Sequence, residues 1–283
     1  MSGHFRAYSF VDKITQLKPG ERAKGVFQVP AHVASFPLTL AAEAAGQLAA
    51  WNAMACLDYK VRPVAGLAAE VRFGPEVRPG QRLDLEVVIE SCEPDAVSYS
   101  AWADADGVRV IELDHSVGPM LPMEQFDSPQ EVRERFELLC GPGAPPGRFA
   151  GVPEHDIEII ERVSEQRVRA ILRVPKQAAF FSDHFARRPV FPGTRLLDAQ
   201  LGLALHFTGG WQRRPSDARL AVTRLYDTKM RSFISPGEVL ELSIDFAPPS
   251  EPGKAFATTA VRMNGKPIAS GKLEMTAVRS SAP

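Results

Sequence analysis

Internal duplication constrains the fold of this chain more than any other feature of its sequence. Three pairs of segments share residue types, chain order and a nearly constant offset of 155 to 158 positions. The pairs are FPLT at 36–39 with FPGT at 191–194, RPGQRLDLEV at 78–87 with SPGEVLELSI at 235–244, and DG at 106–107 with NG at 264–265. Such a repeat indicates two copies of one module joined in a single chain.

The two copies differ most at one place, and the difference concerns a histidine. Val29-Pro30 aligns with Val174-Pro175 at an offset of only 145 positions, so the first copy lacks about ten residues. The missing residues are those around His184 of the second copy. An acid follows the repeated FP segment in both copies, as Glu43 and as Asp198. The first copy therefore holds an acid without a base, and the second copy holds both.

Each copy has the pattern of a short strand pair, one central helix and several long strands. Residues 39–55 are rich in Ala and Leu on almost every side, which indicates a helix buried by its neighbours. Apolar residues alternate with polar ones at period two over 82–90, 97–103, 239–246 and 256–263, which predicts strands. Asp-Gly and Asn-Gly are strong hairpin turns between such strands. This order of elements is typical of an α+β fold rather than a doubly wound α/β fold.

The repeat also predicts the domain boundaries. We expect a first module over residues 1–123, a linker over 124–152 and a second module over 153–283. Within the linker, Ser128-Pro129-Gln130-Glu131 has the form of a capping box with proline at the first helical position. It predicts a helix that runs to about Leu139, followed by a flexible or extended connector rich in Gly and Pro.

Composition narrows the class of protein. The formal net charge of −1 gives no basis for binding nucleic acid or a membrane surface. The three cysteines are odd in number and lack metal-ligand spacing, which indicates a reducing compartment and no metal site. No secretory signal is evident, and no apolar run approaches the ~20 residues that span a bilayer. We therefore expect a cytoplasmic enzyme without a cofactor.

The segment FFSDHFARRPVFPG at 180–193 carries the chemistry. An aromatic pair leads to His184, and a Pro-Gly turn then opens an apolar helix over about 194–207, which holds Asp198 fourteen positions after the histidine. The first N–H groups of a helix have no acceptor within it, so the start at Gly193 can hold an oxyanion. A base, an acid and such donors suit an elimination beside a thioester carbonyl. A lone histidine is more often a packed, hydrogen-bonded residue, so the joint spacing and the flanking residues carry this prediction.

This segment resembles the active-site motif of hotdog-fold β-hydroxyacyl-[acyl carrier protein] dehydratases, which reads roughly F-F-x-G-H-F-P-x-x-P-V-x-P-G followed by an acid. The resemblance implies a double hotdog, in which each module wraps an antiparallel sheet around its helix and the two modules form an internal pseudo-dimer. It also implies dehydration of a 3-hydroxyacyl thioester to a 2-enoyl thioester in fatty acid or polyketide-type biosynthesis. Ser182-Asp183 replaces the usual glycine and Ala186 the usual proline. These departures affect what the resemblance implies about substrate length and direction of reaction, more than what it implies about the fold.

The resemblance further implies roles for individual residues. His184 of the second module should lie opposite Glu43 of the first, with His184 as the base, Glu43 as the acid for the departing hydroxyl, and the Gly193 N–H on the thioester oxygen. Gln47, one turn after Glu43, and Gln200 could orient a substrate or have no such role. Asp198 would then be a vestigial second acid, a structural charge at a helix start, or an acid paired with His32.

Partners and alternatives follow from the same residues. Arg187 and Arg188 flank the motif, and five further basic residues of the second copy could extend a rim that docks an acidic acyl carrier protein; these are Arg195, Arg213, Arg214, Lys229 and Arg231. Scattered solubilising charges explain them equally well, and a coenzyme A thioester would also suit a basic rim. The alternative functions are a hotdog enoyl-CoA hydratase, a hotdog thioesterase and a non-catalytic acyl-binding module. Further homo-oligomerisation is left open.

Overall fold

The computed structural model describes residue 5 and residues 7–145, 147–163, 166–207, 218–248, 251 and 253–279. The N-terminal half contains β1 (Lys13–Lys18), β2 (Arg22–Gln28), α1 (Leu38–Cys56), β3 (Val61–Pro63), β4 (Leu67–Phe73), β5 (Arg82–Cys92), β6 (Ala96–Ala105), β7 (Val108–Pro122), the 3-10 helix η1 (Met123–Gln125) and α2 (Pro129–Cys140). The C-terminal half contains β8 (Asp156–Val163), β9 (Arg167–Arg173), the 3-10 helix η2 (Ala179–Ser182), α3 (Gly193–Phe207), β10 (Ala218–Met230), β11 (Val239–Phe246), β12 (Lys254–Met263) and β13 (Lys266–Arg279).

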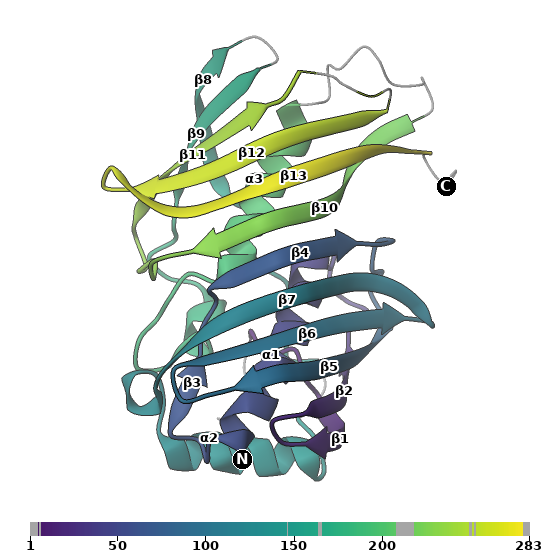
Figure 1. Cartoon of the computed structure of the whole chain (residues 1–283), viewed down its shortest axis with the longest axis vertical. Coiled ribbons are helices and arrows are strands. Elements are labelled where there is room, and N and C mark those ends of the chain that lie inside the picture. The colour runs from purple at the N-terminus through teal and green to yellow at the C-terminus, as the bar shows by residue number, and fades with distance from the viewer. Residues whose placement is uncertain are drawn as a thin grey trace.

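The described strands form one antiparallel sheet that crosses both halves. Its order is β1-β2-β5-β6-β7-β4-β10-β13-β12-β11-β9-β8, with β3 paired to β7 (Figure 1). From the central pair outward, the order is β4-β7-β6-β5-β2-β1 in the N-terminal half and β10-β13-β12-β11-β9-β8 in the C-terminal half. The strands correspond one to one, as a duplicated module requires. The halves join where β4 pairs with β10, with Val71 opposite Leu225. The α+β double hotdog is therefore confirmed.

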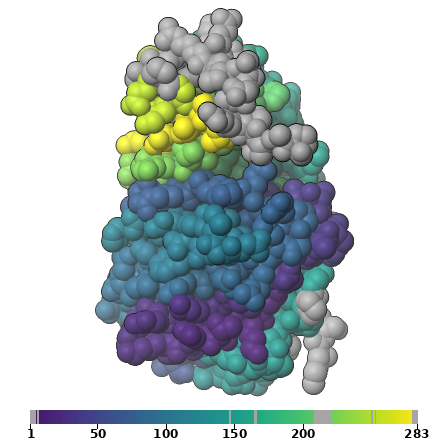
Figure 2. Space-filling model, turned by 90° about the vertical axis from the view of Figure 1, so that its right-hand side faces the viewer, coloured from purple at the N-terminus to yellow at the C-terminus, as the bar shows by residue number. Residues whose placement is uncertain are grey.

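Each half wraps its sheet around one helix, α1 or α3 (Figure 1). Ala41, Ala44, Ala45 and Leu48 of α1 have no exposed surface, because the sheet covers one side of the helix and α3 touches another. Alanines allow this close approach, since they add little bulk between the helix and its neighbours. The N-terminal half, coloured purple to blue in Figure 2, and the green to yellow C-terminal strands lie one above the other along the long axis.

The two predicted hairpin turns have the same backbone conformation. Asp106 and Gly107 join β6 to β7 with φ of 51° and 77°, and Asn264 and Gly265 join β12 to β13 with φ of 52° and 74°. Two successive positive φ angles are the signature of a type I′ turn, whose twist matches that of the flanking strands. The duplication is thus retained in backbone detail at both sites.

The segment between the halves is attached to the N-terminal half. α2 follows Ser128 and has Pro129 at its start, but the Ser128 side chain makes no capping hydrogen bond, so the predicted capping box is wrong. After α2, the Ala144 N–H donates to Asp12 O at 2.7 Å, and the Phe149 ring is 1% exposed within the core. Burial of Phe149 therefore holds this connector extended along the N-terminal half.

The structure also describes the state of the cysteines and the character of the helices. The three cysteines are free thiols, with Cys56 and Cys140 exposed and Cys92 half-buried. Within the described ranges, no helix combines the length and the apolar character needed to cross a bilayer.

Candidate active site

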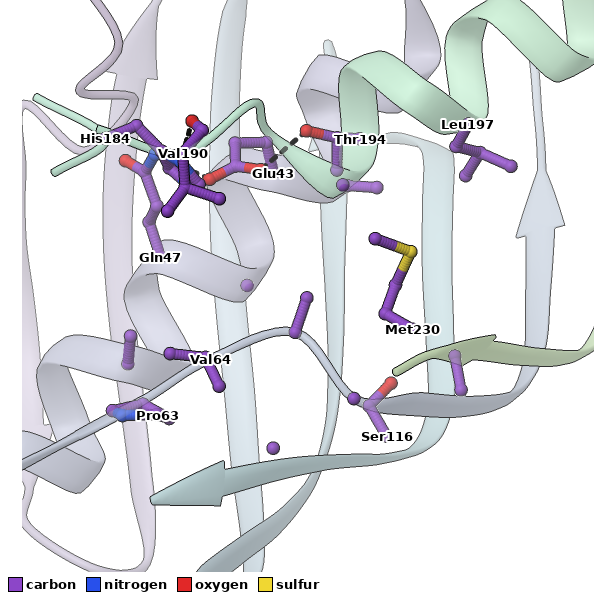
Figure 3. Close-up of a pocket in the computed structure, with 18 of the residues that line it drawn as sticks. Glu43, Gln47, Pro63, Val64, Ser116, His184, Val190, Thr194, Leu197 and Met230 are labelled. Atoms are coloured by element: carbon purple, nitrogen blue, oxygen red, sulfur yellow. Dashed lines mark hydrogen bonds between the residues drawn. The ribbon is translucent and has the colours of Figure 1, made fainter. Parts of the chain in front are cut away.

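A cavity of about 450 Å³ lies where the two halves meet. Side chains from α1 and α3 line one side, and side chains from β4, β7 and β10 line another (Figure 3). The wall is mostly apolar, but His184, Glu43, Gln47 and Thr194 gather at one end. His184 and Glu43, which belong to different copies of the repeat, therefore share one cavity.

His184 is held in a fixed tautomer by the loop that follows it. Its Nδ1 lies 3.0 Å from Val190 O, and because a carbonyl only accepts, Nδ1 carries the proton and Nε2 keeps its lone pair. The Val190 N–H donates to His184 O at 2.8 Å, which closes the loop. Burial lowers the pKa of His184 below its ordinary value, and the negative charge of nearby Glu43 opposes this effect. The ring is therefore neutral at pH 7 and can accept a proton.

Glu43 is fixed by partners on both of its oxygens. Gln47 Nε2 donates to Oε1 at 2.9 Å, and Thr194 Oγ1 donates to Oε2 at 2.6 Å (Figure 3). Gln47 is held in turn, because its Nε2 donates to Tyr8 O at 3.0 Å and its Oε1 accepts from the Phe10 N–H at 2.8 Å. Gln47 therefore positions the acid, and it also lines the cavity.

Tyr8 and Thr194 belong to the site but were not predicted from the sequence as site residues. The Tyr8 hydroxyl lies 2.9 Å from Thr194 Oγ1, which itself contacts Glu43. Burial raises the pKa of Tyr8 well above its ordinary value, so the phenol stays protonated. Thr194 stands in the repeated FPLT/FPGT segment, and this repeat is the sequence feature that could have marked it as a site residue. Tyr8 precedes the first strand and has no pattern that marks it.

Gly193 begins α3 and lines the cavity. As the first residue of the helix, its N–H has no acceptor within α3. A methyl group at this position would come no closer than 3.7 Å to Ala65 or Met230, so space does not require glycine here. The position of Gly193 agrees with the expected oxyanion donor, and its role remains a proposal.

Two arginines in the cavity wall, Arg62 and Arg135, were also missed. Arg62 Nη1 and Arg135 Nη2 lie 2.9 and 2.8 Å from the two oxygens of Asp127, whose side chain is 3% exposed. The Arg62 guanidinium also stacks 4.1 Å above the ring of Phe185, next to the histidine. Burial lowers the pKa of Arg62 to about 10, so it remains a cation at neutral pH. These residues come from β3 and from the segment between the halves, where no motif indicated them.

Asp198 has a different environment from Glu43. Its Oδ2 lies 3.0 Å from His155 Nε2 and accepts from Arg195 Nη1 at 2.8 Å. Glu43 is part of the cavity wall, whereas Asp198 is not among the described residues of that wall. The option that paired Asp198 with His32 is wrong, because His32 is exposed on a turn and His155 is the partner. His155 comes from the segment before β8, where no motif or repeat marks it.

The predicted basic rim is only partly at the surface. Arg187 and Arg188 are exposed and contact the segment around η1, where Arg187 Nη1 donates to Glu124 O at 3.3 Å. Arg195 is wrong as a rim residue, because its side chain is 3% exposed and bound to Asp198. Lys229 and Arg231 are exposed, and Arg231 also lines the cavity. Arg213 and Arg214 lie outside the described residues.

Two further polar residues near the motif have defined positions. Asp183 Oδ2 accepts from the Tyr8 N–H at 2.8 Å and from Ser9 Oγ at 2.9 Å, so it fixes the N-terminal segment to the histidine loop. Gln200 is 5% exposed and lines the cavity. Among the described side chains, no group of three or more His, Cys, Asp or Glu residues gathers as a metal site requires.

The C-terminal half is similar in sequence to known hotdog dehydratases. Residues 160–272 match the family model described as "ApeI-like: ApeI dehydratase". The resemblance to hotdog dehydratases is confirmed. The chain is also 26% identical over 98 residues to the 3-hydroxyacyl-[acyl-carrier-protein] dehydratase FabZ of Burkholderia mallei, a match that covers 32% of this chain and 63% of the relative. The match therefore spans less than two thirds of the length of that relative. These matches support an enzyme of the hotdog dehydratase class.

Solved structures extend the likeness to both halves. A putative oleoyl thioesterase from Lactobacillus plantarum has a TM-score of 0.60 and 11% identity over 93% of this chain and 100% of that one. An acyl-ACP thioesterase from Bacteroides thetaiotaomicron has a TM-score of 0.53 and 15% identity over 90% of this chain and 97% of that one. At such low identity these likenesses establish the shared double-hotdog fold and leave the reaction open.

Proposed function

We propose that the protein dehydrates 3-hydroxyacyl thioesters, carried on an acyl carrier protein, to 2-enoyl thioesters. The observation that carries this proposal is the shared cavity, in which His184 of one module and Glu43 of the other meet at the same end (Figure 3). The family match of residues 160–272 supports a dehydratase rather than another hotdog enzyme. The chain then works as its own pseudo-dimer, with one cross-module pair as its site.

His184 acts as the base in this proposal. Nδ1 is engaged with Val190 O, so Nε2 is the nitrogen that removes a proton from the carbon next to the thioester carbonyl. A neutral imidazole suits this step at pH 7. The negative charge that develops on the thioester oxygen is held by the Gly193 N–H, and the N-terminal end of α3 adds the favourable field of its dipole.

Glu43 acts as the acid, a role that requires its carboxyl group to carry a proton when the substrate binds. Its proton passes to the departing β-hydroxyl, the carbon–oxygen bond breaks, and water leaves as the double bond forms. The proton that His184 has taken then returns to Glu43, which balances the cycle. The hydroxyls of Thr194 and Tyr8 can each donate or accept a hydrogen bond. They can therefore keep a hydrogen bond to Glu43 both when it is protonated and when it is a carboxylate. The same steps in reverse hydrate an enoyl thioester.

The proposal is tested by supplying 3-hydroxyacyl thioesters and following the enoyl product and free thiol together. A dehydratase forms enoyl thioester without releasing thiol. Thiol release without enoyl product would instead identify a thioesterase, which the solved double-hotdog neighbours make the natural rival. An enzyme that hydrates only coenzyme A enoyl thioesters, and ignores the carrier-bound form, would show that the carrier assignment is wrong.

A further inference from the structure

Two arginines in the cavity wall, Arg62 of β3 and Arg135 of α2, share a single counterion. Arg62 Nη1 and Arg135 Nη2 lie 2.9 and 2.8 Å from the two oxygens of Asp127. The Asp127 side chain is only 3% exposed, whereas the two arginine side chains are 16% and 15% exposed and line the cavity. One carboxylate balances only one of the two cations. This part of the wall therefore carries an excess of positive charge.

Each guanidinium keeps one outer nitrogen without a partner among the described residues. In Arg62, Nη1 is bound to Asp127 and the flat face stacks 4.1 Å from the ring centroid of Phe185, which leaves Nη2. In Arg135, Nε donates to Glu131 O at 3.2 Å and Nη2 contacts Asp127, which leaves Nη1. Of the nitrogens in these two side chains, only Arg62 Nε is both enclosed and unpaired. The two outer nitrogens therefore keep accessible surface, and as donors they require an oxygen acceptor.

Glu43 does not supply the missing negative charge when the substrate binds. Burial lowers the pKa of Arg62 to about 10, so this side chain is a cation at pH 7. The negative charges of Asp127 and Glu43 favour the cation, and the positive charge of Arg135 opposes it. In the proposed reaction, however, Glu43 is protonated at this stage. Asp127 then opposes two positive charges, and a desolvated cation without an anion costs free energy.

The cavity follows α1 from the catalytic end toward α2. It is lined by one side chain from each successive turn of α1: Glu43, Gln47, Ala50 and Met54. At 1.5 Å per residue these turns cover about 16 Å. α2, which supplies Arg135, packs against the far turns, where the ring centroids of Phe136 and Trp51 are 6.2 Å apart. An acyl chain whose thioester lies at His184 would extend along these turns of α1.

Arg62 stands close to the catalytic histidine. The Phe185 ring centroid is 4.3 Å from that of His184 and 4.1 Å from the Arg62 guanidinium carbon. Arg62 is therefore no further from the histidine ring than these two distances together. Figure 3 shows Pro63, which follows Arg62 in the chain, on the side of the cavity where Gln47 lies. The excess positive charge thus begins near the reacting end and continues along α1.

This separation limits which anion of a thioester substrate can reach the arginines. An extended chain advances by about 1.2 Å per bond, so a carboxylate roughly six to ten carbons along the acyl chain would meet them. The phosphate of a pantetheine arm is about 13 bonds from the thioester sulfur, or roughly 15 Å when the arm is extended, which carries it past Arg62. The distances favour an anion on the acyl chain.

From this arrangement we infer that the cavity binds 3-hydroxyacyl thioesters whose acyl chain ends in a carboxylate, and that Arg62 and Arg135 bind this carboxylate. The inference rests on the proposed function, whose substrate class it names. A carboxylate accepts charge-assisted hydrogen bonds from two guanidinium groups at once, and it neutralises the second cation. The methylene groups of such a chain would pack against Ala50 and Met54. A plain alkyl chain would leave the second cation without an anion.

The test compares matched substrates on the wild type. They are N-acetylcysteamine thioesters of 3-hydroxy dicarboxylic acids of about six to ten carbons, each with the distal carboxylate free or as its methyl ester. The ester keeps the chain length and the carbonyl group but removes the charge. At the best chain length, kcat/KM for the free acid should exceed that for the ester by at least ~10-fold. Equal values, or faster reaction of the ester at every length, would show that the inference is wrong.

Variants on one helix assign this preference to a residue. Arg135→Gln should remove most of the preference for the free acid, and Arg135→Lys, which keeps the charge and the contact with Asp127, should retain part of it. Arg133→Gln is the matched control, because Arg133 is exposed on α2 and pairs with Asp58. It should keep the full preference. Full preference in Arg135→Gln would contradict the inference. If that variant does not fold, Arg135→Lys and the wild-type comparison still decide.

A second pair of substrates tests the phosphate of the carrier's arm. Plain 3-hydroxyacyl thioesters of pantetheine and of 4′-phosphopantetheine differ only in that phosphate. The two should react with similar kcat/KM on the wild type. If the phosphate raises kcat/KM at least ~10-fold and Arg135→Gln abolishes the difference, the arginines bind the carrier's arm, and the assignment of an acyl carboxylate is wrong.

Binding separates this inference from the proposed reaction. Amide analogues, in which N–H replaces the thioester sulfur, cannot be turned over as thioesters and are titrated by calorimetry. If the free-acid amide binds the wild type more tightly than Arg135→Gln, and no thioester is dehydrated, the inference is supported and the proposed function is contradicted. Dehydration of the methyl ester substrates with no preference for the free acid, in rate or in binding, would do the reverse.

Discussion

Thr194, at the start of α3, donates a hydrogen bond of 2.6 Å to Oε2 of Glu43 on α1. The opposite contact exists in weaker form, because Thr39 at the start of α1 lies 3.4 Å from Oδ1 of Asp198 on α3. Each threonine thus reaches across to the acid of the other helix. Duplication has produced the same contact twice, but only the first lies beside a histidine in the cavity.

Replacing Thr194 by valine should lower turnover by ~10-fold or more. The variant keeps the shape of the side chain but removes a hydrogen bond to an acidic group, a loss worth about 1.5–3 kcal/mol. Thr39→Val makes the identical change beside Asp198 and is the matched control. We expect kcat for a 3-hydroxyacyl thioester to fall in the first variant only. Equal losses in both would indicate that the threonines stabilise the helix interface rather than the acid.

The sequence predicted the parts of the site that its repeat and motif contain. Glu43 and His184 were recognised because one stands in the duplicated segment and the other in an insertion unique to the second copy. Tyr8, Arg62 and His155 could not be recognised in this way. Their positions depend on how the first segments of each module and the short strand β3 pack around the helices, and such long-range contacts leave no periodicity in the chain.

Glu43→Gln and His184→Ala should each reduce kcat by at least ~10²-fold, the usual effect of losing a general acid or base. Both variants should fold, because each alters one side chain at a cavity wall. Asp198→Asn is the control on the opposite helix and should have a mild effect on kcat. The measurement is enoyl thioester formation by absorbance. A loss for Asp198→Asn as large as that for Glu43→Gln would show that both acids take part in catalysis.

Activity should persist to lower pH than an ordinary histidine would allow. The base must be neutral, and burial lowers the pKa of His184, so kcat/KM should remain flat below the ordinary value of about 6.5 before it falls. The Phe185 ring stacks on His184 with centroids 4.3 Å apart. Phe185→Ala admits water and should move the acid limb of the pH profile upward. An unchanged limb would mean that another group controls it.

Asp127→Asn should destabilise the fold by about 3 kcal/mol, because it removes a buried charge that pairs with two cations. Arg62 and Arg135 both contact this carboxylate, whose side chain is 3% exposed. The free energy of unfolding is measured in urea, with an unchanged m-value as the sign that the folded state is intact. Asp58→Asn breaks an exposed pair with Arg133 and should have little effect. Comparable losses in the two variants would contradict the role given to the buried pair.

Reversing Arg187 and Arg188 to glutamate should raise KM for a carrier-bound substrate. Both side chains are exposed beside the histidine loop, and an acidic carrier protein would be attracted to them. Turnover at saturation should change little, because docking charges act mainly on encounter. The same reversal at Arg78 and Arg82, which are exposed around the start of β5, is the matched control and should leave KM unchanged.

Salt and a small substrate then separate docking from a direct effect on the site. The rise in KM should fade as salt approaches ~0.5 M, where the screening length falls well below the ~8 Å of physiological ionic strength. An N-acetylcysteamine thioester has neither carrier nor phosphates and should be insensitive to the reversal. The Arg188 guanidinium also lies 4.3 Å above the ring of Phe233 in the cavity wall. If the small substrate suffers as much as the carrier-bound one, these arginines shape the cavity, and carrier docking occurs elsewhere.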